Sequence, residues 1–169
     1  MPNWVPSVDS IQLAFKASVE NVKSNLTAAG KNKKEAAMEV LLVLLQVVFV
    51  LLILLGLPGA PPPWFIAQIL GVVLFLLGAF FFVAATATMG TKLTFLPTPT
   101  AGMTLVDQNV YQHCRHPQYF GMIAFGLGLS LVSLSCNRLL WTVLLWLVLE
   151  KKADIEELCL AEEFPDTCE

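Results

Sequence analysis

The chain has 169 residues, of which 56% are hydrophobic and only 14% are charged, and its mean hydropathy is +0.70. A soluble domain cannot bury that much apolar surface, so the composition excludes an ordinary soluble protein and indicates an integral membrane protein. The formal net charge of −3 reflects acidic residues gathered from Glu150 onward, and no nucleic-acid signature is present, so we expect no nucleic-acid partner.

Residues 1–36 form an amphipathic N-terminal segment. Apolar side chains recur at helical spacing behind Asp9 and Ser10, which are good helix-capping residues. The apolar positions are Ile11, Phe15, Val19, Val22 and Leu26. We expect this helix to lie on the membrane surface, where its lysines favour an anionic leaflet, although docking onto a partner subunit would use the same stripe.

Residues 37–169 are expected to form an all-α, multi-pass membrane bundle. The runs 40–57 and 64–85 are apolar except for Gln46 and Gln68, and each is long enough to cross ~30 Å of hydrocarbon. Two further apolar runs follow the central loop, and the second of them is short for a span at ~1.5 Å per residue. We predict four spans in two hairpins, at about 38–57, 64–86, 118–135 and 138–150.

The fourth helix is predicted to continue into an acidic helical tail over 151–164. Ser135, Cys136 and Asn137 form a tight turn before this helix, and no helix breaker follows until Pro165. The last span and the tail should therefore be one continuous helix.

The positions of Lys and Arg predict the orientation in the membrane. Arg138 alone falls between the third and fourth spans, whereas the other basic residues flank the opposite ends: Lys16, Lys23, Lys31, Lys33, Lys34, Lys92, Arg115, Lys151 and Lys152. Because cytoplasmic segments carry the excess of basic residues, we expect both termini and the loop 86–117 on the cytoplasmic or equivalent side. The proline-rich turn 58–63 should face the other side. The pattern fits the endoplasmic reticulum, an organelle or a bacterial inner membrane.

The central segment 109–121 reads N-V-Y-Q-H-C-R-H-P-Q-Y-F-G and interrupts the apolar runs with polar side chains. Pro117 should occupy the first turn of the third membrane helix, with His116 at or beside its cap. The free amides of that helix end, next to Arg115, would suit a carboxylate or phosphate. Alternatively, Arg115 extends to lipid phosphates and Pro117 only starts a helix.

Metal binding and ion transport are both disfavoured by the residues present. His113, Cys114 and His116 supply at most three ligands, too few for a structural zinc or a di-iron site, so we expect no metal. The span interiors hold no charged residue, which ion or proton coupling normally requires. Gly121, Ala124 and Gly128 share one helix face, which favours close helix packing.

The four cysteines suggest no disulfide framework. Cys114 and Cys136 should sit at opposite ends of the third span, far beyond bonding distance. Cys159 and Cys168 are conceivable partners without further support.

Several motifs follow one another in the second half of the chain. They are M-G-T-K-L-T at 89–94, P-T-P at 97–99, Tyr111, Arg115-His116-Pro117, Tyr119, Gly121, and the acidic set Glu156-Glu157, Leu160 and Phe164. In this order they resemble the isoprenylcysteine carboxyl methyltransferase and phospholipid methyltransferase family of membrane enzymes. Asn109 replaces the glycine that usually precedes the signature tyrosine, and asparagine tolerates left-handed backbone. The tail after Phe164 differs from the family pattern, with Pro165 and Cys168.

The resemblance implies transfer of a methyl group from S-adenosylmethionine to a membrane lipid or lipidated acceptor, either a prenylcysteine carboxylate or a phospholipid amine. Arg115 and Tyr119 would be the catalytic residues. Residues implied to bind the cofactor are Tyr111, His116, Pro117, Gly121, Glu156 and Glu157, with the glutamates pairing with its ammonium group.

Two alternatives stay open. Glu156 and Glu157 could be a solvated helix face, paired one turn away with Lys152. The chain could also be a catalytically inactive relative that serves as a structural or assembly subunit of a photosynthetic or respiratory membrane complex.

Overall fold

A computed structural model describes residues 8–27, 33–56, 65–96, 106 and 108–163 of the chain. Within this part every regular element is helical, as predicted. The elements are α1 (Val8–Thr27), α2 (Lys33–Leu55), α3 (Phe65–Met89), the short 3-10 helices η1 (Gly90–Lys92) and η2 (Asn109–Gln112), α4 (Pro117–Ser133) and α5 (Cys136–Glu163). The proline-rich turn 58–63 and the motif residues 97–99 lie outside the described residues.

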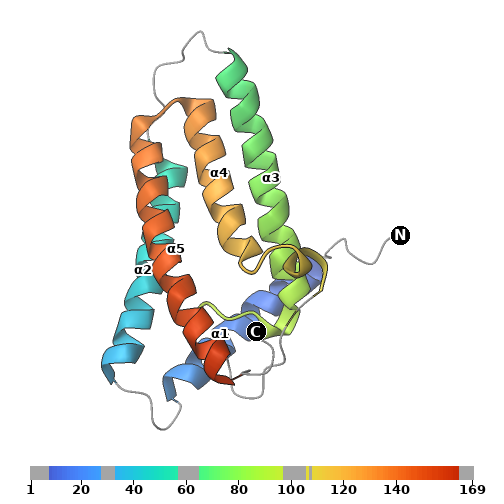
Figure 1. Cartoon of the computed structure of the whole chain (residues 1–169), viewed down its shortest axis with the longest axis vertical. Coiled ribbons are helices and arrows are strands. Elements are labelled where there is room, and N and C mark those ends of the chain that lie inside the picture. The colour runs from blue at the N-terminus through green and yellow to red at the C-terminus, as the bar shows by residue number, and fades with distance from the viewer. Residues whose placement is uncertain (1–7, 28–32, 57–64, 97–105, 107, 164–169) are drawn as a thin grey trace.

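The four long helices run side by side, and α1 lies across the end of the bundle where α2 begins and α5 finishes (Figure 1). The main packing pairs are α3 with α4, α2 with α5, and α4 with α5. The predicted hairpin of the last two helices is confirmed. The prediction of a first hairpin is wrong, because α2 packs on α5 and α3 packs on α4, so α2 and α3 form opposite edges of the bundle.

Glycines allow α3 and α4 to approach closely. A Cβ atom added to Gly78 would lie 2.3 Å from the backbone nitrogen of Phe125, and one added to Gly121 would lie 2.6 Å from that of Phe82. Two turns further along the helices, Gly71 and Gly128 likewise face backbone atoms of the opposite helix. The predicted packing role of the small-residue face on α4 is therefore confirmed.

The turn between α4 and α5 is shorter than expected. Leu134 adopts a left-handed conformation, with φ 42° and ψ 43°, and α5 already begins at Cys136. The N–H groups of Leu134 and Ser135 satisfy carbonyls of the last turn of α4. Beyond this turn α5 continues without interruption past Glu150, which confirms the predicted continuous helix.

A small apolar core forms where α2, α4 and α5 meet. Ile53, Leu145 and Leu149 are almost fully buried, and Trp141 stacks on Phe49 with ring centroids 6.0 Å apart. At the far end of the same contact, the Arg138 guanidinium donates a hydrogen bond to the Gly56 carbonyl at the end of α2. Both contacts hold α2 against the hairpin formed by α4 and α5.

Helix α1 packs against the rest of the chain through small side chains, one amide and one aromatic ring: Phe15 contacts Phe95 edge-on, with ring centroids 5.8 Å apart. Ala14 and Ser18 are fully buried, and the Asn21 amide donates to the carbonyls of Thr91 and Leu93 at 3.3 and 3.0 Å. Most of the predicted apolar stripe faces outward, and Phe15 is 60% exposed. Helix α1 begins at Val8, so Asp9 and Ser10 lie in its first turn and not before it. Contact of this stripe with a membrane surface stays a prediction.

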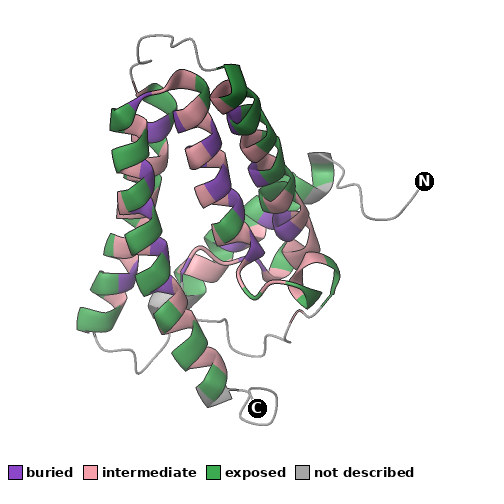
Figure 2. Cartoon of the chain, turned by 45° about the horizontal axis from the view of Figure 1, so that its top comes forward, coloured by how far each residue is buried: buried purple, intermediate pink, exposed green. Residues whose placement is uncertain are grey.

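Two described stretches, Lys34–Leu55 and Phe65–Lys92, are long and apolar enough to cross a membrane. Figure 2 shows buried residues between the helices and exposed residues on the outer faces of the bundle. Those outer faces of α2 and α3 are rich in leucine, valine and phenylalanine, and Ile66 is 83% exposed. Such extended apolar surface requires an apolar environment, whereas crossing by α4 and α5 stays a prediction.

Candidate functional site

The candidate site lies at the end of the bundle where α4 begins. Pro117 is the first helical residue of α4 and His116 is its N-cap, as the sequence predicts. Proline is suited to this position because it has no N–H to leave unpaired and its φ angle is already helical. The capping residue makes no side-chain cap hydrogen bond, so the His116 ring is available for other contacts.

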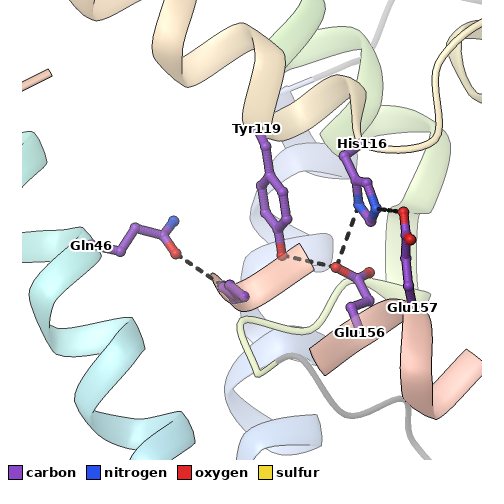
Figure 3. A network of polar contacts seen from close by, with 6 residues as sticks. Gln46, His116, Tyr119, Glu156 and Glu157 are labelled. Carbon is purple, nitrogen blue, oxygen red and sulfur yellow. Dashed lines mark hydrogen bonds and ion pairs between the residues drawn. The ribbon is translucent and has the colours of Figure 1, made fainter. Parts of the chain in front are cut away.

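His116 faces two carboxylates of α5 (Figure 3). Its Nε2 lies 3.1 Å from Glu157 Oε1, and its Nδ1 lies 3.6 Å from Glu156 Oε2. An ionised carboxylate can only accept, so Nε2–H is the donor to Glu157. Residues 41 positions apart in sequence are thus joined, because α5 extends beyond its packing on α4 and passes the start of that helix.

Tyr119 completes this cluster from the first turn of α4. Its hydroxyl donates to Glu156 Oε2 at 2.9 Å, so Glu156 lies between the phenol and the imidazole (Figure 3). The rings of His116 and Tyr119 stack with centroids 5.3 Å apart and planes inclined by 4°. They are three positions apart in the sequence, which places both on one face of a helix start. We call His116, Tyr119, Glu156 and Glu157 the carboxylate cluster.

Lys152 joins the carboxylate cluster to α2. Its ammonium donates to Gln46 Oε1 at 2.9 Å and lies 5.5 Å from the centroid of the Tyr119 ring. Only 3% of Lys152 is exposed. Burial lowers the pKa of Lys152 from 10.5 to about 8, and the nearby Glu156 carboxylate opposes part of that shift. In the alternative of a solvated helix face, Lys152 would be exposed to water, whereas it is buried in the bundle.

The η2 helix places Tyr111 beside the same carboxylates. Burial and the negative charge of Glu156 raise the pKa of Tyr111, so its phenol stays neutral at physiological pH. Asn109 begins η2 with φ 54°, the left-handed conformation that glycine would adopt more readily. The Asn109 amide also donates to Thr88 Oγ1 at 3.4 Å, which ties η2 to the end of α3.

A polar recess of about 240 Å³ adjoins the end of α3. It is lined by Thr88, Met89, Gly90, Thr91, Lys92, Val106 and Gln108. Most of these residues belong to the loop motif 89–94, and Gln108 directly precedes η2. The loop motif and the residue before η2 therefore line one recess.

The other predicted site residues take different places. Arg115 is exposed and makes no hydrogen bond or ion pair with any described residue. Pro117 is buried at the helix start, and Gly121 is buried against the backbone of Phe82. Gly121 thus belongs to the contact between α3 and α4, and a part of Pro117 and Gly121 in cofactor binding stays a prediction. Phe164, the last residue of the acidic motif, lies outside the described residues.

No group of three or more His, Cys, Asp or Glu side chains in the described residues could hold a metal ion. Cys114 precedes α4 and Cys136 follows it, which confirms that they lie at opposite ends of this helix. Cys168 is outside the described residues, so its pairing with Cys159 stays untested.

Two residues of the site were not predicted: Gln46 and Lys152. Gln46 had a signal, since it is one of two amides in the long apolar runs, and a buried amide needs a hydrogen-bonding partner. Its partner could not be found from the sequence, because Lys152 lies 106 residues further along. Lys152 could not be singled out either, because the sequence alone does not distinguish it from the neighbouring Lys151.

The fold and site together define a helical membrane-type protein with a charged cluster at one end of the bundle. The family model described as phospholipid methyltransferase matches residues 66–167, which include both parts of the carboxylate cluster. The chain therefore belongs to the phospholipid methyltransferase family. Comparison with curated proteins and with solved structures gives no match. Membership in a methyltransferase family implies S-adenosylmethionine as the general methyl donor, and the two apolar stretches agree with a membrane location.

Proposed function

We propose that the chain transfers a methyl group from S-adenosylmethionine to a membrane-embedded acceptor of lipid or isoprenoid type. The observation that carries this proposal is the carboxylate cluster at the end of an apolar helical bundle. A water-soluble donor and an apolar acceptor could both reach this position, one from the aqueous side and the other along the helices. Membership in the phospholipid methyltransferase family supports the reaction type.

The residues present fit the donor. Glu156 and Glu157 offer two adjacent carboxylates, with side chains 24% and 50% exposed, that suit an ammonium group. His116 and Tyr119 hold these carboxylates in place, and Tyr111 and the loop 89–94 supply neighbouring polar surface. S-adenosylmethionine supplies a methyl group already activated on a sulfonium, so the protein contributes mainly positioning and exclusion of water.

The two proposed catalytic residues are Arg115 and Tyr119. Arg115 is unpaired among the described residues and suits an acidic acceptor or the carboxylate of the donor. Tyr119 lies at the boundary between the carboxylate cluster and the apolar core. A prenylcysteine carboxylate would need no strong base, whereas a phospholipid amine must first lose a proton, which His116 or a cluster carboxylate could accept.

We further propose four membrane spans, formed by α2, α3, α4 and α5, with α1 on the membrane surface. The carboxylate cluster and the start of α2 lie at the same end of the bundle, which we place on the cytoplasmic or equivalent side. Exposed apolar residues on one face of α1, such as Phe15 and Val19, would then meet the lipid leaflet close to the donor site.

Calorimetric binding of S-adenosylhomocysteine to the purified protein in detergent tests this function. We expect saturable binding that is weakened about tenfold by Glu157→Gln, because that change removes a charge-assisted contact. Arg115→Ala tests the second charge in the same way. Asp154→Asn is the matched control: Asp154 lies one turn earlier on the same helix, is exposed, and pairs only with Lys151 among the described residues.

Absence of binding to the folded protein would contradict the enzymatic proposal. It would favour instead a structural or assembly subunit of a larger membrane complex, photosynthetic or respiratory, built on a methyltransferase scaffold. Equal weakening by Glu157→Gln and Asp154→Asn would show a general electrostatic effect and no specific site.

A further inference from the structure

Adjacent lysines on α5 have opposite environments. Lys151 is 73% exposed on its side chain and pairs with Asp154 at 3.0 Å. Lys152 is 3% exposed and points toward α2 and α4. A buried ammonium is costly unless it is well paired, so its position requires a reason beyond helix solubility.

The hydrogen-bonding partner of Lys152 comes from a part of the chain outside the residues that the family model matches. Gln46 lies in α2, before the matched residues 66–167, and its carbonyl oxygen accepts from the Lys152 ammonium at 2.9 Å. The other end of the same amide lies 3.4 Å from the sulfur of Met122 on α4. Gln46 is thus held from two helices, and its orientation is fixed toward Lys152.

The Lys152 ammonium connects this amide to the carboxylate cluster. It lies 5.5 Å from the centroid of the Tyr119 ring, a favourable cation–π distance, and its charge is attracted by Glu156 one turn later. The Tyr119 hydroxyl in turn donates to Glu156. A continuous line of contacts therefore runs from Gln46 through Lys152 and Tyr119 to Glu156.

We propose that Gln46 and Lys152 are positioning residues for the candidate site: Gln46 holds the Lys152 ammonium against the Tyr119 ring, and this contact fixes the hydrogen bond from Tyr119 to Glu156. The inference rests on the proposed function only where it concerns ligand binding. It assigns α2 a part in the site, although α2 lies outside the family match.

A double-mutant cycle separates positioning from simple stability. Gln46→Leu removes the acceptor and leaves the ammonium buried without it, so this variant should lose stability. Gln46→Leu with Lys152→Met removes both polar groups and should regain stability, because replacing a whole buried pair by apolar residues is often neutral. If the pair positions the site, the double variant still binds S-adenosylhomocysteine about tenfold more weakly than the wild type.

Lys151→Met is the matched control, since it removes the neighbouring charge from an exposed position. It should leave binding and stability unchanged. Full recovery of ligand binding in the stable double variant would overturn the proposal, because the pair would then serve stability alone.

A second measurement decides the positioning claim without any ligand. The chain has only two tyrosines, Tyr111 and Tyr119, so carbon-13 labelling of the tyrosine rings gives two resonances, and Tyr111→Phe assigns them. We expect the Tyr119 resonance to move in Gln46→Leu and in the double variant, and to stay in place in Lys151→Met. An unmoved Tyr119 resonance would refute the inference. If the wild type binds no S-adenosylhomocysteine, only the proposed function fails, and the tyrosine spectra still test the positioning role.

Discussion

At the scale of single residues, burial shifts the pKa values of ionisable side chains in the site. Lys152 and Tyr111 both carry ionisable groups away from water, and in each case burial is the largest cause of the pKa shift. Burial disfavours the charged form of each group. It therefore lowers the pKa of the Lys152 ammonium and raises the pKa of the Tyr111 phenol. The negative charge of Glu156 raises the pKa of both groups.

Lys152 makes stability depend on pH in a defined window. Its pKa is about 8 in the folded protein and near 10.5 when exposed, so between these values the unfolded chain binds the additional proton. Stability should therefore increase as pH rises through this window. The same contribution is lost as pH decreases through 8. We expect a gain of about 2 kcal/mol between pH 8 and pH 9.5, measured by unfolding in detergent.

Lys152→Met provides the comparison for that experiment. The variant lacks the titrating group, so its stability should change much less over the same window. A wild-type protein whose stability is flat or declines from pH 8 to 9.5 would show that Lys152 is not desolvated as described.

At the scale of helices, backbone contact decides which pair is tightest. Gly78 and Gly121 face each other across α3 and α4, and backbone atoms of one helix occupy the space of the missing side chain on the other. Gly126, by contrast, faces the side chain of Thr142 on α5. A side chain can adjust, whereas the backbone of a packed helix cannot move without separating the helices.

We therefore expect Gly78→Ala to be more damaging than Gly126→Ala. The added methyl group at Gly78 would lie 2.3 Å from a backbone nitrogen, and we estimate a loss of about 2 kcal/mol from overpacking. At Gly126 the first obstacle is the Thr142 hydroxyl at 2.8 Å, and the loss should be smaller. Thermal unfolding of both variants in one detergent checks the order, and the reverse order would contradict the described packing.

At the scale of the whole molecule, the candidate site gathers four separate segments at one end of the bundle. These segments are the start of α4, the extension of α5, η2 and the loop after α3 (Figure 1). Helix α1 binds that loop through hydrogen bonds from Asn21. The short turn between α4 and α5 lies at the opposite end. If α4 crosses the bilayer, these two ends face different compartments.

Cysteine labelling in sealed vesicles tests this arrangement. Two variants with a single cysteine are compared. One keeps only Cys136, which is exposed at the turn, and the other carries only Lys151→Cys, at an exposed position toward the opposite end. The 17 residues of α4 extend about 25 Å, close to the thickness of a bilayer core. A membrane-impermeant maleimide should therefore label the two positions from opposite sides, whereas labelling from one side would show that α4 and α5 do not span.

The sequence by itself determined the helical class, the long apolar runs and the residues of the family motifs. These features are local: apolar runs of membrane length, Pro117 at a helix start and an unbroken α5 follow from composition and spacing along one segment. It also determined that Asn109 could replace glycine, and the backbone there is indeed left-handed.

Only the tertiary structure decided how those segments meet. It placed α2 against α5 and not against α3, because Ile53, Leu145 and Leu149 fit together at that contact. It left Arg115 exposed while burying Lys152, two cations that sequence patterns treat alike. Which charge is buried depends on partners contributed by distant helices, and the Gln46 amide that receives Lys152 is 106 residues away, beyond the reach of any local pattern.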